Sequence, residues 1–232
     1  LAVSPVLSKI YGDQSRLVSW NSVTGDIITP FASIDVASWY GVEISESSIS
    51  ALAVSSDGAR IYAAYEDGFF RSWSEASGAL LATLQVSKAA YDALNTEESA
   101  DANELMFRAK VGQPINTLVA VGDSEVYSGA ADGALVSWNG QTGTKAQTFQ
   151  ASGSPPILAL AASGSKLFSG DQSGALVSWD TTSGTTEQQT MQASSGSPIL
   201  ALAASGSKLF SGDGNGALVC WITSGPKVRK MQ

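Results

Sequence analysis

A short strand-like run that ends in tryptophan recurs five times along this chain, and a glycine follows each time after a few turn residues. The five pairs of tryptophan and glycine are Trp20 and Gly25, Trp73 and Gly78, Trp138 and Gly143, Trp179 and Gly184, and Trp221 and Gly225. Self-similarity at a period of about forty residues is typical of an array of structural repeats, either a propeller or a solenoid. The recurrence therefore limits the fold before any single residue suggests a chemistry.

The last two repeats are nearly copies of each other. Residues 156–179 and 198–221 differ at only three positions. The repeats that begin at Ile49 and Ile115 keep the same layout although most of their residues differ. Duplication of one unit explains this pattern most simply, and the layout that survives the changes is the part that determines the fold.

Each repeat contains four runs of strand length separated by turn residues. In the fourth repeat the runs are residues 157–163, 166–171, 175–180 and 185–192. The first run is small and apolar, as expected of a strand buried on both faces, and the fourth is polar, as expected of an exposed edge strand. The repeats lack a sustained helical apolar period, so helix pairs are excluded and an all-β fold is predicted.

One such four-stranded sheet cannot bury its own faces, whereas several sheets packed around an axis can. We therefore predict a β-propeller of five four-stranded antiparallel blades in a single domain, residues 1–232. The expected blades are about residues 1–31, 49–85, 114–150, 156–192 and 198–232. Residues 1–11 align without gaps on residues 158–168, so the chain begins at an inner strand and ends after an outer one. A complete ring and part of a larger ring both fit this arrangement.

The core of the repeat, in which Ser-Gly and a turn precede Leu-Val-Ser-Trp, resembles that of the WD-repeat propellers. In that family a Trp-Asp pair ends the third strand of each blade. Trp179 with Asp180 matches the pair, Trp20 with Asn21 and Trp138 with Asn139 are near matches, and Trp73 with Ser74 and Trp221 with Ile222 depart from it. The resemblance covers nearly all of the chain outside two insertions, and it implies that the five tryptophans anchor the blades.

In the WD-repeat family an Asp in the turn between the second and third strands joins a hydrogen-bond network with the Trp, a Ser or Thr, and the His of a Gly-His pair. Asp67 and Asp132 occupy that turn position here, and the resemblance makes them blade anchors as well. Ser15, Ser173 and Asn215 stand there in the other repeats. The chain has no histidine, so it diverges from the family pattern. The resemblance indicates a scaffold and not a specific function.

The net charge of -8 argues against a nucleic-acid surface, which needs clustered Lys and Arg to replace counterions on phosphate. The one basic cluster, Lys227, Arg229 and Lys230, fits a solvated outer strand, with contact to an acidic partner as the alternative. No apolar run is long enough to span a bilayer, so direct membrane insertion is not expected. A single cysteine rules out an intrachain disulfide. This fits a cytoplasmic or organellar location better than secretion, and the compartment is left open.

Catalysis needs a positioned acid, base, nucleophile or metal. The chain has no histidine, no cysteine cluster and no phosphate-binding loop, so we expect no enzyme activity, no cofactor and no metal. Cys220 replaces a Ser of the other repeats and is expected to be a small packed residue. Paired carboxylates could serve a glycosidase. However, Asp13, Asp171 and Asp213 lie in equivalent turns, where Asp usually hydrogen-bonds to the local backbone.

Two insertions, about residues 30–48 and 86–112, lengthen the connection between one outer strand and the next inner strand. By the resemblance, such connections emerge on one face of the ring. The first insertion carries Trp39 and Tyr40, and aromatic side chains on projecting loops are favoured anchors of protein interfaces. The alternative is that this pair folds back over the end of a blade.

The second insertion carries Leu105, Met106 and Phe107 after an acidic stretch, residues 97–104, that is either functional or a solvated loop. These features together predict a non-catalytic scaffold that mediates protein-protein interactions as a subunit of a larger complex. The alternative is a multivalent, lectin-like carbohydrate-binding propeller, because near-identical repeats suit repeated binding sites. A hydrolase is the third class.

Overall fold

The structure is a computed structural model. It describes residues 2–4, 9–12, 17–21, 23–24, 26–30, 49–65, 70–84, 114–142, 145–150, 154–182, 189–192, 196–224 and 229–230. These residues form twenty strands and no helix, which confirms the all-β prediction. Within the same ranges there is accordingly no helix long and apolar enough to cross a membrane.

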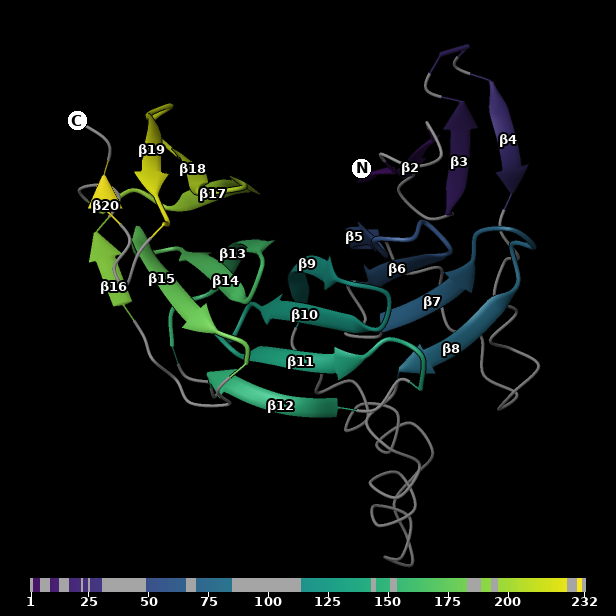
Figure 1. Cartoon of the computed structure of the whole chain (residues 1–232), viewed down its shortest axis with the longest axis horizontal. Helices are drawn as coiled ribbons and strands as arrows, with labels where there is room; N and C mark the ends of the chain where they lie inside the picture. The colour runs from purple at the N-terminus through teal and green to yellow at the C-terminus, as the bar shows by residue number, and fades with distance from the viewer. Residues whose placement is uncertain are drawn as a thin grey trace, which may run out of the picture. The chain divides into compact units, whose positions relative to one another are not determined.

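The strands form five sheets of four consecutive strands each, and we number the sheets in chain order (Figure 1). Sheet 1 comprises β1 (Ala2–Ser4), β2 (Lys9–Gly12), β3 (Val18–Asn21) and β4 (Ile27–Pro30). Sheet 2 comprises β5 (Ile49–Val54), β6 (Arg60–Tyr65), β7 (Phe70–Ser74) and β8 (Leu80–Leu84). Sheet 3 comprises β9 (Ile115–Val121), β10 (Glu125–Ala130), β11 (Leu135–Asn139) and β12 (Lys145–Gln150).

Sheet 4 comprises β13 (Ile157–Ser163), β14 (Lys166–Asp171), β15 (Ala175–Asp180) and β16 (Gln189–Gln192). Sheet 5 comprises β17 (Ile199–Ser205), β18 (Lys208–Asp213), β19 (Leu218–Ile222) and β20 (Arg229–Lys230). The first three runs predicted for the fourth repeat coincide with β13, β14 and β15. Successive four-stranded antiparallel meanders are the blade-like sheets of a propeller-like fold. Closure into a ring stays a prediction.

The hairpins close through turns that need glycine. Between β14 and β15, Gly174 has a φ of 85°, and its amide donates to the carbonyl oxygen of Asp171 at 3.2 Å. Gly216 has a φ of 82° in the matching turn between β18 and β19, and its amide donates to the carbonyl oxygen of Asp213 at 3.0 Å. Glycine adopts positive φ without steric cost, so the spacing from Asp to Gly sets the turn and the strand register.

The chain divides into two compact units. Unit 1 comprises Leu1–Ile115, Gly122–Glu125 and Asn139–Thr144, and unit 2 comprises Asn116–Val121, Val126–Trp138 and Lys145–Gln232. Each unit contains its own contacts between neighbouring sheets. The prediction of a single domain stays a prediction.

Each sheet has two faces that differ in composition. In sheet 4 the register places Leu167 opposite Trp179, and we call the face with these two residues the anchor face. Phe168 and Leu176 lie on the other face, which we call the receiving face, because neighbouring residues of a strand point to opposite sides. The same definition applies to the matching positions of the other sheets.

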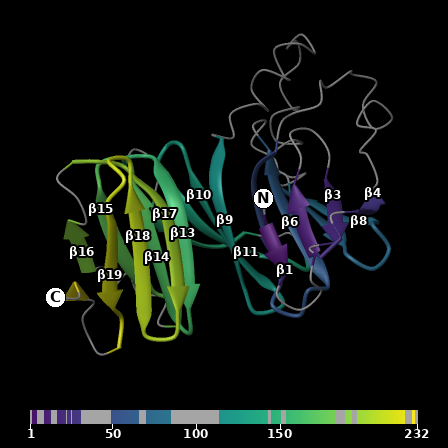
Figure 2. The same cartoon turned by 90° about the horizontal axis from the view of Figure 1, so that it is seen from above.

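The receiving face of sheet 4 packs on the anchor face of sheet 5. One buried cluster joins Ala161, Phe168 and Leu176 of sheet 4 to Leu209 and Trp221 of sheet 5. The inner strands β13 and β17 lie side by side, as Figure 2 shows. Burial of apolar side chains is the main favourable contribution to such packing.

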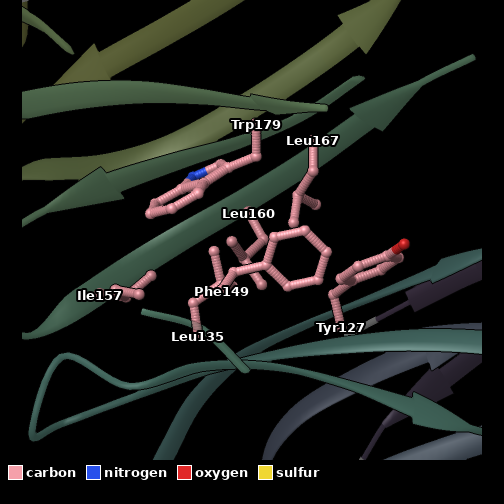
Figure 3. Close-up of a cluster of buried hydrophobic side chains, with 7 residues drawn as sticks. All are labelled: Tyr127, Leu135, Phe149, Ile157, Leu160, Leu167 and Trp179. Atoms are coloured by element: carbon pink, nitrogen blue, oxygen red, sulfur yellow. The ribbon is translucent and has the colours of Figure 1, made fainter. Parts of the chain in front are cut away.

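Sheets 3 and 4 repeat this arrangement within unit 2 (Figure 3). Tyr127 and Leu135 of sheet 3 join Leu167 and Trp179 of sheet 4 in one buried cluster. Phe149 of β12 lies between the two aromatic rings. Its ring centroid is 5.6 Å from that of Tyr127 and 6.2 Å from that of Trp179, both in edge-to-face geometry.

Unit 1 contains a third example. Leu17 directly precedes β3 of sheet 1 and is buried in one cluster with Ile61, Tyr65 and Trp73 of sheet 2. Leu17 stands three residues before Trp20, as Leu135 stands three residues before its tryptophan in sheet 3. The leucine at this position therefore contacts the anchor face of the following sheet in all three interfaces.

Candidate functional site: the tryptophan anchors and acidic turns

In sheets 3, 4 and 5 the anchoring tryptophan is hydrogen-bonded to a serine ten residues earlier in the chain. The indole nitrogen Nε1 donates to the serine Oγ from Trp138 to Ser128 at 2.8 Å, from Trp179 to Ser169 at 2.9 Å and from Trp221 to Ser211 at 2.9 Å. The three serines are buried. An indole N–H buried without an acceptor would cost about 1–3 kcal/mol, so this pair allows the tryptophan to pack inside.

Sheet 2 lacks this hydrogen bond. Ala63 occupies the serine position, and the buried Trp73 Nε1 has no hydrogen-bond partner among the described residues. Around it, the Tyr65 ring centroid lies 6.3 Å from that of Trp73, and the guanidinium carbon of Arg71 lies 4.3 Å from the Tyr65 centroid. A cation over an aromatic ring is attracted by the ring quadrupole. Sheet 2 thus holds its tryptophan by packing beside a cation–π pair.

The repeated acidic residues close turns. Asp171 Oδ1 accepts hydrogen bonds from the amides of Ser173 and Ala175, both at 2.9 Å, and from the Ser173 hydroxyl at 2.7 Å. Asp213 Oδ1 accepts from the amides of Asn215 at 3.0 Å and Ala217 at 2.9 Å. These bonds confirm the turn interpretation for Asp171 and Asp213.

The turn of sheet 3 uses a different acid for the same purpose. Asp132 Oδ1 accepts from the Ala134 amide at 3.0 Å. Asp132 aligns with Ser173 of sheet 4, whereas Ala130 aligns with Asp171. A carboxylate at either of two positions therefore serves the same backbone amide, which explains why the acid moves between repeats while the turn is retained.

Among the described residues of unit 1, the Asp57 carboxyl and the Tyr62 hydroxyl have a perturbed pKa. The Ser55 hydroxyl donates to Asp57 Oδ1 at 2.6 Å, and this bond, together with the Ala59 amide at 2.9 Å, lowers the pKa of the Asp57 carboxyl. Burial raises the pKa of the Tyr62 hydroxyl. The Asp57 bonds belong to the turn between β5 and β6, where they serve the backbone.

The structure places only some of the residues that the sequence singled out. Trp73, Trp179 and Trp221 are buried and Trp138 is partly buried. For Trp20 and Arg229 the backbone alone is described. Cys220 is partly buried, and Lys230 is exposed. The predicted residues that lie outside the described ones are Asp13, Ser15, Trp39, Tyr40, Asp67, Leu105, Met106, Phe107 and Lys227.

The predictions from sequence did not include the residues that join one sheet to the next. Leu135 and Leu176 stand three residues before their tryptophans and are fully buried against the following sheet. The signal was available, because a leucine recurs three residues before each of the five repeat tryptophans except Trp73. In the described part of the chain there is no group of three or more His, Cys, Asp or Glu side chains placed to hold a metal ion.

No protein-family model matches the chain. No curated protein matches it either. Many solved chains are similar in structure, among them the following three. The computationally designed Ika8 protein has a TM-score of 0.64 at 21% identity, over 93% of this chain and 55% of that one. The computationally designed Ika4 protein has a TM-score of 0.57 at 24% identity, over 78% and 94%.

The third is a chain of the Mitotic Checkpoint Complex, with a TM-score of 0.69 at 16% identity, over 96% of this chain and 59% of that one. This chain thus spans little more than half the length of the Ika8 chain and of the chain from the Mitotic Checkpoint Complex. At these identities the similarity establishes a shared fold, and that fold is built from repeated antiparallel sheets.

Proposed function

We propose that the chain is a non-catalytic, WD-repeat-like propeller scaffold of five blades that binds other protein subunits within a larger complex. The proposal rests on the hydrogen bonds that the polar side chains of the repeats form. The serines bind indole nitrogens and the aspartates bind turn amides, as Ser169 and Asp171 do. The recurring polar groups thus serve the scaffold, and we assign partner binding to segments outside the repeats.

The comparison with solved structures supports the role of a subunit. A chain of similar fold is part of the Mitotic Checkpoint Complex, where by its name it works within an assembly. At 16% identity this similarity concerns the fold alone, and it does not identify the partners of this chain. The net charge of -8 favours protein partners over nucleic acid.

We assign the contact with the partner to the two insertions. Trp39 and Tyr40 in the first are of the residue types enriched at interface hot spots, and the second contributes the apolar run Leu105, Met106 and Phe107. Truncating an interface anchor typically costs about 1 kcal/mol or more, and about 2 or more at a hot spot. Replacing all five should therefore release a partner while leaving the sheets folded.

The test uses the tagged full chain to recover partners from an extract of its source. A variant with alanine at these five positions should lose the partner that the unmodified chain retains. Val23→Ala is the matched control, since Val23 is an exposed apolar residue of the turn between β3 and β4. Partner recovery that is undiminished in the five-residue variant, with intact folding by circular dichroism, would reject this assignment.

The second candidate is multivalent carbohydrate binding. It is favoured by one observation, that sheets 4 and 5 present the same turn twice, with exposed Gln172 and Ser173 in one and exposed Gly214 and Asn215 in the other. A glycan array separates the two functions. A lectin should bind with a strength that rises with ligand density, whereas the scaffold should show no glycan binding.

A further inference from the structure

The chain contains two Asn-Gly pairs, Asn139 with Gly140 and Asn215 with Gly216. An asparagine that precedes glycine loses its side-chain amide most readily, because glycine has no side chain to hinder its backbone nitrogen. That nitrogen attacks the asparagine Cγ within the same chain, and two groups held side by side react without a bimolecular encounter. Since the two pairs have the same local sequence, a difference in their reactivity has to come from the structure around them.

The structure protects the first pair. Asn139 Oδ1 accepts hydrogen bonds from the two backbone amides that follow Gly140, both at 2.9 Å, so its side chain is fixed. The Gly140 amide donates to the carbonyl oxygen of Ser124 at 2.6 Å, so the attacking nitrogen is engaged. Gly140 is also buried, and a Cβ added to it would overlap the side chain of Tyr62. All of these contacts lie within unit 1.

The second pair lies in the turn between β18 and β19 and has far fewer contacts. Asn215 is exposed, and its side chain forms no hydrogen bond with a described residue. The Gly216 amide donates to the carbonyl oxygen of Asp213 at 3.0 Å, so opening of this one turn bond frees the nitrogen. Ser173 has the matching position in sheet 4 and is exposed although sheet 5 packs on sheet 4. A side chain at this position therefore stays exposed even with a neighbouring sheet in place.

The turn around Asn215 depends on the length of its backbone. The Asp213 amide donates to the carbonyl oxygen of Ala217 at 3.0 Å, and the Ala217 amide donates to Asp213 Oδ1 at 2.9 Å. Both bonds span Asn215, and the pairing of β18 with β19 begins directly beside them, with Gly212 opposite Leu218. An extra main-chain atom between residues 215 and 216 would therefore change the separation of the groups that these bonds join.

We propose that Asn215 is a site of spontaneous deamidation and that its products weaken the turn between β18 and β19. The Gly216 nitrogen loses its proton to hydroxide and forms a bond to Asn215 Cγ, and the bond from Cγ to Nδ2 breaks as ammonia leaves. Water then opens the resulting cyclic imide at either carbonyl carbon. Opening at Cγ yields aspartate. Opening at the backbone carbonyl carbon yields isoaspartate, in which the main chain runs through Cγ and is longer by a methylene group.

Each product also adds a carboxylate to a turn that already contains Asp213. The turn of sheet 3 has Asp132 at the position of Asn215 but an alanine at the position of Asp213. The turn of sheet 4 has Ser173 there, whose hydroxyl donates to Asp171 Oδ1 at 2.7 Å. Neither turn has carboxylates at both positions, and two like charges in one turn repel each other. The inference concerns a chemical change of the fold with time and goes beyond the proposed scaffold function.

The first test follows both asparagines in the purified full chain during incubation at mildly alkaline pH. Peptide mapping by mass spectrometry should show Asn215 converted to a mixture of aspartate and isoaspartate while Asn139 stays intact. The chain unfolded in guanidinium chloride should convert both, because unfolding removes the contacts that protect Asn139. Equal conversion of the two asparagines in the folded chain, or an Asn215 that converts only after unfolding, would overturn the proposal.

The second test asks whether the conversion weakens the turn. The incubated chain should unfold at a lower urea concentration than the fresh chain. Asn215→Ser should keep its midpoint during incubation, because serine forms no imide and Ser173 already occupies the matching turn of sheet 4. Asn139→Asp, which places there the acid that sheet 4 has as Asp180, should lose stability with time as the unmodified chain does. An unchanged midpoint after conversion, or an equal loss in Asn215→Ser, would overturn the assignment of the weakened turn to this site.

Discussion

Sheets 4 and 5 have almost the same sequence and yet bury different residues. Their anchor faces are alike, since Trp179 and Trp221 are both buried and both donate to a serine. Their receiving faces are opposite in exposure, with Leu176 fully buried and Leu218 exposed. The comparison teaches that local sequence determines the strands, turns and anchor of a sheet, whereas burial of the receiving face depends on what lies next to it.

The largest expected difference concerns these two leucines. Leu176→Ala should lower the free energy of unfolding by about 2–5 kcal/mol, because it leaves a cavity between sheets 4 and 5. Leu218→Ala should change it by no more than about 0.5 kcal/mol, as surface substitutions usually do. Urea unfolding followed by tryptophan fluorescence, at a concentration where the chain is a monomer, measures both. Equal losses for the two variants would show that the face of sheet 5 is covered within one chain, and the comparison would fail.

The second difference concerns the two glycines of the receiving faces. Neither Gly170 nor Gly212 has a positive φ, so alanine is compatible with the backbone at both positions. Gly170→Ala should cost about 1–3 kcal/mol, because the added methyl group overlaps Ile199. Gly212→Ala should be neutral or stabilise by about 0.4–1 kcal/mol, since it restricts the unfolded chain without a clash. Thermal unfolding of the pair provides the measurement, and a matching loss at Gly212 would reveal a neighbour on that face.

The features that sequence predicted well are those determined within one repeat. The bounds of β13, β14 and β15 follow from alternating small or apolar residues and the glycines between them, and the roles of Asp171 and Asp213 follow from their turns. These are local interactions over a few residues, and two near-identical repeats adopt them twice.

The exposure of sheet 5 could not be predicted in this way. Leu176 and Leu218 lie in the same local sequence, Gly-Ala-Leu-Val, so no pattern within the repeat distinguishes the buried leucine from the exposed one. Their difference arises from packing between sheets, which depends on residues about forty positions away. The candidate anchors Trp39 and Tyr40 lie outside the described residues, and their role stays a prediction.

The smallest predicted effect extends the comparison of anchor faces to sheet 2. The register pairs Ala63 with Arg71 and Ile61 with Trp73, as it pairs Ser169 with Val177 and Leu167 with Trp179 in sheet 4. A serine at residue 63 would therefore stand where Ser169 accepts the indole hydrogen bond. Ala63→Ser should stabilise the chain by about 0.5–1.5 kcal/mol, the usual net value of a hydrogen bond to a group that was buried without a partner.

The control for this variant is Ala64→Ser, which adds a hydroxyl at an equally buried position on the opposite face of β6. Its hydroxyl gains no indole partner, so this variant should destabilise the chain. The prediction is therefore that the free energy of unfolding rises in Ala63→Ser and falls in Ala64→Ser. Thermal unfolding measures the sign of each change. Slower hydrogen exchange of the Trp73 indole proton in Ala63→Ser would show that the new hydrogen bond forms at that tryptophan. Destabilisation by Ala63→Ser would mean that the Arg71 and Tyr65 side chains leave no room for the hydroxyl. Sheet 2 would then be a separate solution to burying a tryptophan, and not an incomplete version of sheet 4.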